Sequence, residues 1–171
     1  MKTTVLLKYL LLLVITGIVS CKDKADICKV FLNKELIAEL KNKAVDTLQI
    51  DNNKYVLDAC VYRNFHPTFY SNRNIRLLTA SNWLINTDSV VIPNNIDLIK
   101  QYVIKGDSIW IADYETKPLE LEFNFKKGRI SRNGPEWNTY IYVDVISKIH
   151  DSNTNKDYFL KIKNVYIEKE E

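Results

Sequence analysis

Over residues 27–40, apolar side chains recur at intervals of three and four positions. This spacing places them on one face of an α-helix and leaves polar side chains on the other. Asp26 is positioned to cap the start of such a helix, and Lys41 and Lys43 suit its C-terminal end, where cations interact favourably with the helix dipole. The pattern predicts one early helix, with an apolar face made of Cys28, Phe31, Leu32, Leu36 and Leu40.

From Thr47 onward the pattern changes to the alternation of β-strands. Apolar and polar side chains alternate over 119–125, 141–145 and 158–167, as expected of strands with one buried face. A one-residue change of phase around Asn164 predicts a β-bulge in the last of these. Residues 55–61 are partly apolar on both faces, which favours a central strand. Two shorter strands are predicted at 75–80 and 89–92.

Turn-forming residues separate these segments. Gly106-Asp107 joins 98–105 to 108–114 as a tight hairpin, and Ser152–Asn155 separates the last two strands in the same way. Asp51-Asn52-Asn53 divides 47–50 from 54–65. The pattern gives about seven to nine short strands with no alternation of strands and helices, so it predicts an all-β domain.

Two architectures fit such a series of strands. The long connections 65–74 and 127–138 suit crossings between two sheets, so we expect an immunoglobulin-like antiparallel β-sandwich with a short N-terminal helix. The cysteine–tryptophan–cysteine pattern of true immunoglobulin domains is absent, so this expectation concerns architecture alone. A lipocalin-like closed β-barrel is the alternative.

The N-terminus has the pattern of a secretory signal peptide. Lys2 and Lys8 precede an apolar run from Tyr9 to Val19, and charged residues resume at Lys22. The run is shorter than the ~20 residues that a membrane-spanning helix needs. We therefore expect a signal peptide at 1–20, a tether at 21–26 and a single β-rich domain at 27–171.

The segment Ile18-Val19-Ser20-Cys21 resembles the lipobox of bacterial lipoproteins. In that family the cysteine thiol is diacylated, the preceding peptide bond is cut, and the new amino terminus is usually acylated. The resemblance implies lipidation of Cys21, and two or more acyl chains hold a protein stably at a membrane. The residue after Cys21 is Lys22 rather than an aspartate, and by the same resemblance this argues against retention in the inner membrane. We therefore expect the protein to be anchored in the outer membrane, on its periplasmic or cell-surface face.

Composition and charge place the chain among ordinary globular proteins. It has 171 residues, 46% of them hydrophobic and 26% charged. The chain has 24 basic and 21 acidic residues, and without Lys2 and Lys8 about 22 basic residues remain. This near balance gives no electrostatic reason to expect a nucleic-acid partner.

Catalytic and metal-binding motifs are missing from the sequence. His66 and His150 lie in different segments and match no metal-ligand spacing. There is no nucleophile elbow and no glycine-rich phosphate loop. We therefore expect neither an enzyme nor a metal or cofactor. A hydrolase that gathers carboxylates from several strands is the less favoured alternative, and its candidate acids are Asp113, Glu120, Glu122 and Asp144.

Cys28 and Cys60 are the remaining cysteines once Cys21 is lipidated. An extracytoplasmic compartment permits a disulfide between them. Cys60 lies within an apolar strand pattern, however, where a free cysteine behaves as a small hydrophobic residue. Both possibilities stay open.

Two loops and the following strand carry candidate recognition residues. The first loop is formed by residues 63–67. The second loop, 132–137, leads into a strand whose tyrosines point outward. The candidate surface consists of Arg132, Asn133, Trp137, Tyr140 and Tyr142. Arginine and aromatic residues are enriched at interface hot spots. Alternatively, Trp137 closes one end of the core and Arg132 pairs with an acid such as Asp144. Trp110, Tyr114 and Tyr102 form either an exposed sugar-stacking row or internal packing pairs.

The strings "RNFHPTF" (63–69), "RNGPEW" (132–137) and "YIYVDV" (140–145) resemble uncharacterised small lipoproteins of gut Bacteroidota. The resemblance implies a secreted β-sandwich and no particular activity. We expect a membrane-anchored, non-catalytic binding module for a protein or glycan, with a structural role in envelope assembly as the alternative.

Overall fold

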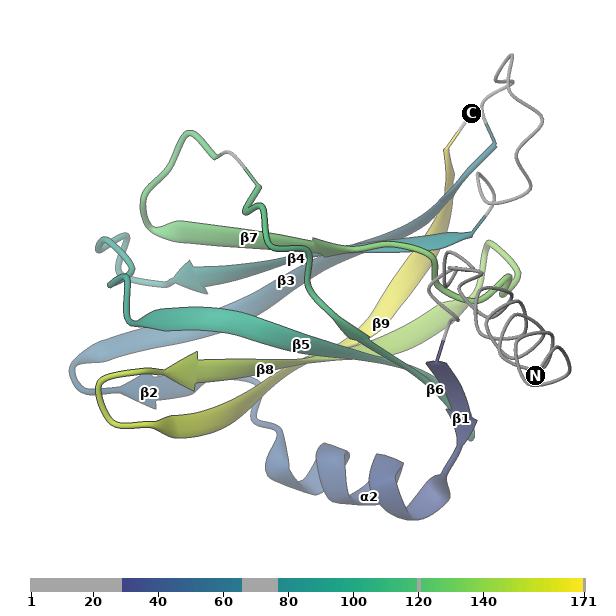
Figure 1. Cartoon of the computed structure of the whole chain (residues 1–171), viewed down its shortest axis with the longest axis horizontal. Helices are drawn as coiled ribbons and strands as arrows, with labels where there is room; N and C mark the ends of the chain where they lie inside the picture. Colours follow the sequence, from purple (N-terminus) through teal and green to yellow (C-terminus); the bar gives the residue numbers. More distant parts are fainter. Residues whose placement is uncertain (1–28, 66–76, 120, 171) are drawn as a thin grey trace, which may run out of the picture.

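The computed structural model describes residues 29–65, 77–119 and 121–170 of the chain (Figure 1). These residues form an all-β domain with one short helix near its start, as predicted. The elements are β1 (Lys29–Leu32), α2 (Lys34–Lys43), β2 (Leu48–Ile50), β3 (Asn53–Asn64), β4 (Leu78–Asn86), β5 (Ile96–Lys105), β6 (Ser108–Asp113), β7 (Lys126–Ser131), β8 (Tyr142–Asp151) and β9 (Lys156–Glu170).

The strands form one curled sheet that makes a half-barrel. The strand order is β1-β6-β5-β8-β9-β3-β4-β7, and β2 pairs with β3 in addition. All of these pairs are antiparallel except β3–β9, so the sheet is mixed, whereas the sequence predicted antiparallel strands throughout. β9 makes this junction because it is long: residues 156–166 pair with β8, and Ile167–Glu170 pair with β3.

The main core fills the inside of the curl. In the view of Figure 1, β4 and β7 lie above β5 and β8. The inward side chains of β4, β5 and β8 belong to one apolar cluster. β3 is bonded on one side to β4 and on the other to β9, which confirms its central position. Its inward residues Tyr55, Leu57 and Val61 are all buried.

Helix α2 begins later than the sequence predicted. Residues 29–32 form a strand instead, and the helix cap is Asn33, whose side chain accepts a hydrogen bond of 2.9 Å from the Leu36 N–H, rather than Asp26. An asparagine cap satisfies one of the free amide groups at a helix start, which fixes the boundary there. The helix packs on the outer face of the sheet through a second apolar cluster, which contains Ile37, Leu40, Ala44, Ile104, Ile109 and Ile146.

The predicted turns and bulge are confirmed. Gly106, at φ +55°, lies in the two-residue loop that joins β5 to β6, and residues 152–155 join β8 to β9. The register between β8 and β9 shifts between Val143 and Val145, opposite Asn164 at φ +57°. The Asn164 N–H donates to the Asp144 carboxylate at 3.3 Å. This bulge keeps Leu160 and Ile167 on the same, inward face of β9.

Two predicted strands are wrong. Residues 89–92 contain no strand, and the described part of 119–125 contributes only an isolated bridge between Leu119 and Gly128. Both segments are loops that contact each other, because the Ile92 N–H donates to the Asn124 carbonyl at 3.1 Å. Phe123 remains 51% exposed. The edge strand next to β4 is β7, which runs through Gly128. The strand predicted at 75–80 corresponds to β4, which begins at Leu78.

Candidate functional site

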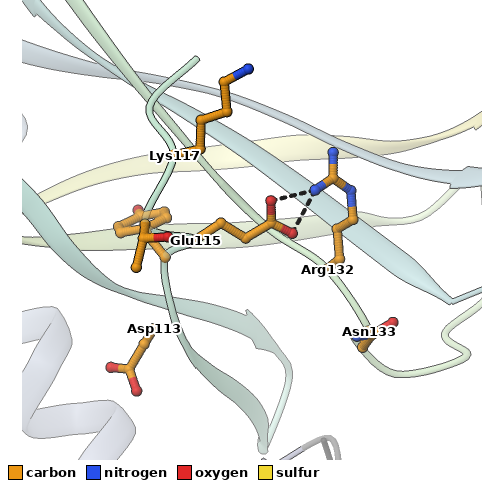
Figure 2. A pocket seen from close by; sticks show the side chains of 7 residues that line it. Asp113, Glu115, Lys117, Arg132 and Asn133 are labelled. Carbon is orange, nitrogen blue, oxygen red and sulfur yellow. Dashed lines mark hydrogen bonds and ion pairs between the residues drawn. The ribbon is translucent and has the colours of Figure 1, made fainter.

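A surface pocket of about 500 Å³ contains two of the predicted recognition residues, Arg132 and Asn133 (Figure 2). Its other lining residues come from the end of β6 and the segment that follows it. There the Glu115 N–H donates to the Ile130 carbonyl at 2.9 Å, which holds the segment against β7. The complete lining is Asp113, Tyr114, Glu115, Thr116, Lys117, Arg132 and Asn133.

An ion pair lies at the centre of this pocket. One terminal nitrogen of Arg132 bonds both carboxylate oxygens of Glu115, and both side chains are about half-exposed (Figure 2). Arg132 therefore pairs with an acid, but with Glu115 rather than with Asp144, which binds Lys41 at 2.8 Å. Asp113 pairs with Lys100 at 3.2 Å. The pocket thus carries charges of both signs.

Tyr114 connects the pocket to the core. Its hydroxyl accepts a hydrogen bond from Asn82 Nδ2 at 2.8 Å and shares one of 2.7 Å with the Ser147 hydroxyl. Asn82 also donates to Gln101 at 2.9 Å. Burial raises the pKa of the Tyr114 hydroxyl well above its usual range, although these hydrogen bonds act in the opposite direction. The side chain is therefore a neutral structural element.

The proposed sugar-stacking row is not exposed. Trp110 is buried in the main core, and Tyr114 packs against that core. Tyr102 lies on the opposite face of the sheet, under α2, with its ring centroid 6.2 Å from that of Phe159. The packing alternative is correct for these rings, because β5 and β6 are covered on both faces.

Trp137 supports one end of the domain. Its partly buried ring packs against the main core, and its carbonyl accepts a hydrogen bond of 3.0 Å from Arg63. Lys105 Nζ lies 5.6 Å from the centre of the ring. These contacts agree with the interpretation that Trp137 closes the core.

Tyr140 and Tyr142 of the predicted surface are exposed, at 62% and 64%. Both contact Tyr166 of β9, with ring centroids 5.9 and 5.2 Å from its ring. Tyr142 is directly opposite Tyr166 in the pairing of β8 with β9. We call Tyr140, Tyr142 and Tyr166 the tyrosine cluster. Desolvation and the two neighbouring tyrosines raise the pKa of Tyr166.

Sequence reasoning missed Tyr166, although the signal was present. The bulge at Asn164 turns Val165 and Ile167 inward, which sends the intervening Tyr166 outward. The predicted surface is thus divided: the tyrosine cluster shares no residue with the pocket of Arg132 and Asn133.

A second hollow, of about 410 Å³, was also missed. Trp83 lies beside Gly128, where a Cβ atom would be only 2.9 Å from the indole ring, so the glycine leaves room for it. The hydrophobic pattern of the sequence does not distinguish an outward tryptophan such as Trp83 from a tryptophan in the core. The lining residues are Asp58, Trp83, Leu121, Glu122, Phe123 and Lys126.

The remaining candidates have separate positions. Cys60 is half-buried. Burial is the main cause that raises the pKa of its thiol, and the nearby acidic side chains add to this effect. Cys28 lies outside the described residues, as do Cys21, His66 and Glu120, so the disulfide and the lipidation stay predictions. His150 bonds Asp157 at 2.9 Å.

Within 29–65, 77–119 and 121–170, no three His, Cys, Asp or Glu side chains are grouped as metal ligands. No helix in this part of the chain is long and apolar enough to cross a membrane. No protein-family model matches the chain, and neither does any curated protein or solved structure.

Proposed function

We propose that this protein is a lipoprotein anchored through Cys21 to the outer membrane, whose β domain is a non-catalytic binding module for a protein or glycan. The exposed tyrosine cluster is the observation that carries the binding role. Three tyrosines with their rings in contact offer a large apolar area together with hydroxyl groups that remain available for hydrogen bonds. Surfaces of this kind are enriched at interface hot spots.

The backbone under the cluster supports the same proposal. Tyr140 has a φ of +64°, a conformation that a bulky residue rarely adopts and that costs about 1–3 kcal/mol. Hydrogen bonds of 2.8 Å from the Tyr140 N–H to the Ile167 carbonyl, and from the Ile167 N–H to the Ile141 carbonyl, hold it there. A surface fixed in this way loses less entropy on binding.

Photo-crosslinking in the cells that produce the protein tests the binding role. A photoreactive phenylalanine analogue replaces Tyr142. In the control protein the same analogue replaces Val91, which is 54% exposed and is distant in sequence from the tyrosine cluster. We expect a defined protein or glycan adduct from position 142 alone, and its loss when Tyr140 and Tyr166 are changed to serine. Identical adducts from both positions would contradict the proposal.

The anchor has its own test. Mass spectrometry of the purified protein should find Cys21 as the first residue, carrying the mass of two or three acyl chains. An intact leader, or a secreted product without acyl mass, would contradict the lipoprotein assignment, which depends on the lipobox resemblance at residues 18–21.

For the architecture, we propose an incomplete barrel, close to the lipocalin-like alternative, rather than an immunoglobulin-like sandwich. The parallel pairing of β3 with β9 supports this, because it joins strands that a sandwich would divide between two sheets. The Ile167 N–H donates to the Ile141 carbonyl, so the amides that alternate with it, those of Glu168 and Glu170, face β3. Slow hydrogen exchange at the amides of Glu168 and Glu170, equal to that of β8, is the expected result.

The alternatives make different predictions. A structural lipoprotein would return one stoichiometric envelope protein in the crosslinking experiment, irrespective of the tyrosine cluster. A hydrolase would need a pair of carboxylates such as Asp113 and Glu115, which share the pocket of Figure 2. Each is exposed and paired with a cation, which favours a solvated surface role over acid–base catalysis.

A further inference from the structure

Strand β1 exposes three consecutive apolar side chains. Val30 is 39% exposed, Phe31 46% and Leu32 83%. None of them belongs to either apolar core cluster. Edge strands are usually protected by charged residues, and a run of three exposed apolar residues on one is unfavourable unless it has a function.

The position of β1 at the edge of the sheet explains why side chains on both of its faces are exposed to solvent. Among the described residues it is the terminal strand of the sheet and is bonded on one side, to β6 (Figure 1). Its partners Trp110 and Ile109 are buried, so the core is already complete beneath β6. The chain then turns at the Asn33 cap into α2, which buries Ile37 and Leu40 further along. The apolar side chains of β1 therefore lie outside the buried core.

We propose that Val30, Phe31 and Leu32 contact the bilayer to which the chain is anchored and orient the domain on it. This inference rests on the lipid anchor of the proposed function. Only residues 22–28 separate Cys21 from β1. Fully extended, this tether reaches roughly 25–30 Å at 3.3–3.6 Å per residue. The first strand of the domain is thus held close to the lipid surface.

A bilayer fits this surface better than a protein partner does. A stable protein interface buries about 800 Å² on each partner, and three side chains on a four-residue strand fall short of that. A chain that is already anchored needs little additional affinity, because the anchor supplies a high local concentration of lipid.

Lipid quenching of tryptophan fluorescence tests the proposal. The full-length acylated protein is inserted into phosphatidylethanolamine–phosphatidylglycerol vesicles that contain phospholipids brominated on their acyl chains. Leu32→Trp is the reporter. Val91→Trp is the matched control, because Val91 is also exposed and lies in the β4–β5 connection, at the opposite end of the domain from β1 in Figure 1.

The signal of the unsubstituted protein, which comes from Trp83, Trp110 and Trp137, is subtracted from each spectrum. We expect the added tryptophan at position 32 to be blue-shifted and quenched at least twofold by brominated lipid. The one at position 91 should be unaffected. Equal quenching at the two positions would overturn the proposal.

Two other outcomes are distinguishable. If mass spectrometry of the same preparation finds no acyl chains on Cys21, the anchor fails and this inference falls with it. In the other outcome, Cys21 is acylated but the tryptophan at position 32 is not quenched by brominated lipid. If its emission then shifts to the blue as the protein density in the vesicles rises, β1 contacts a second copy of the chain, and the bilayer proposal is wrong. Unchanged circular dichroism of Leu32→Trp confirms that the variant folds.

Discussion

The guanidinium group of Arg129 on β7 forms two hydrogen bonds with the carboxylate of Asp97 on β5. The Nε atom donates to Oδ1 at 3.1 Å, and a terminal nitrogen donates to Oδ2. These strands are not neighbours in the sheet, so the pair bridges the two halves of the curl. Arg129 is mostly buried, with 15% of its side chain exposed.

Breaking this bridge should destabilise the domain. Arg129→Ala leaves the partly buried Asp97 without its cation, and hydrogen bonds to charged groups contribute about 1.5–3 kcal/mol. We expect a loss of about 2 kcal/mol in the free energy of unfolding, measured by urea denaturation. Arg132→Ala is the matched control, because the half-exposed Arg132–Glu115 pair should contribute less than ~1 kcal/mol. Equal losses in the two variants would show that the Arg129 bridge has no special role.

Gly134 marks a close approach of the 132–137 loop to the core. A Cβ atom there would lie 2.7 Å from a ring carbon of Trp110 and 2.8 Å from the Leu78 Cβ. Gly134→Ala should therefore cost about 1–3 kcal/mol through overpacking and alter the tryptophan fluorescence. At Gly106 the space is open, and alanine should cost only about 1–2 kcal/mol for the positive φ, with unchanged fluorescence. An unaltered spectrum for Gly134→Ala would argue against the contact with Trp110.

Asp151 should make stability depend on acid pH. Its carboxylate accepts hydrogen bonds of 2.6 Å from Thr154 and from Asn95, and one of 3.0 Å from the Asn153 N–H. These bonds lower its pKa from the ordinary value of 3.8. A lowered folded-state pKa gives stability that is present above the unfolded value and is lost as the pH falls through the folded one.

The corresponding experiment is a series of melting temperatures between pH 2 and 6. The native protein should lose stability below about pH 4 more steeply than Asp151→Asn, which cannot titrate. Parallel curves for the two proteins would mean that Asp151 does not contribute.

Tyr114 should act at the other end of the pH scale. Its folded-state pKa is raised by burial, so its contribution is complete below the unfolded value of about 10 and is lost as the pH rises further. Tyr114→Phe removes this dependence and also removes the hydrogen bonds of the Tyr114 hydroxyl with Asn82 and Ser147, which costs about 1–3 kcal/mol at neutral pH. Stability measured at pH 7 and pH 11 separates the two effects. A variant as stable as the native protein at pH 7 would rule out the hydrogen-bond network.

The sequence determined the local features of this protein. Alternation identified β3, β8 and β9, the phase change at Asn164 identified the bulge, and Gly106-Asp107 identified a hairpin. These features depend on residues that are close together in the chain, because side-chain alternation and turn geometry are local properties. The same reasoning selected the exposed Tyr140 and Tyr142.

Only the tertiary structure decided which segments became strands and which side chains met. Residues 119–125 have a clear strand alternation, yet their described part pairs with β7 through one bridge only, between Leu119 and Gly128, and otherwise forms a loop. Tyr166 contacts Tyr142, which is 24 positions away in the sequence. Glu115 binds Arg132, which is 17 positions away. Pairings of this kind depend on how the whole sheet curls around its core, which no local pattern encodes.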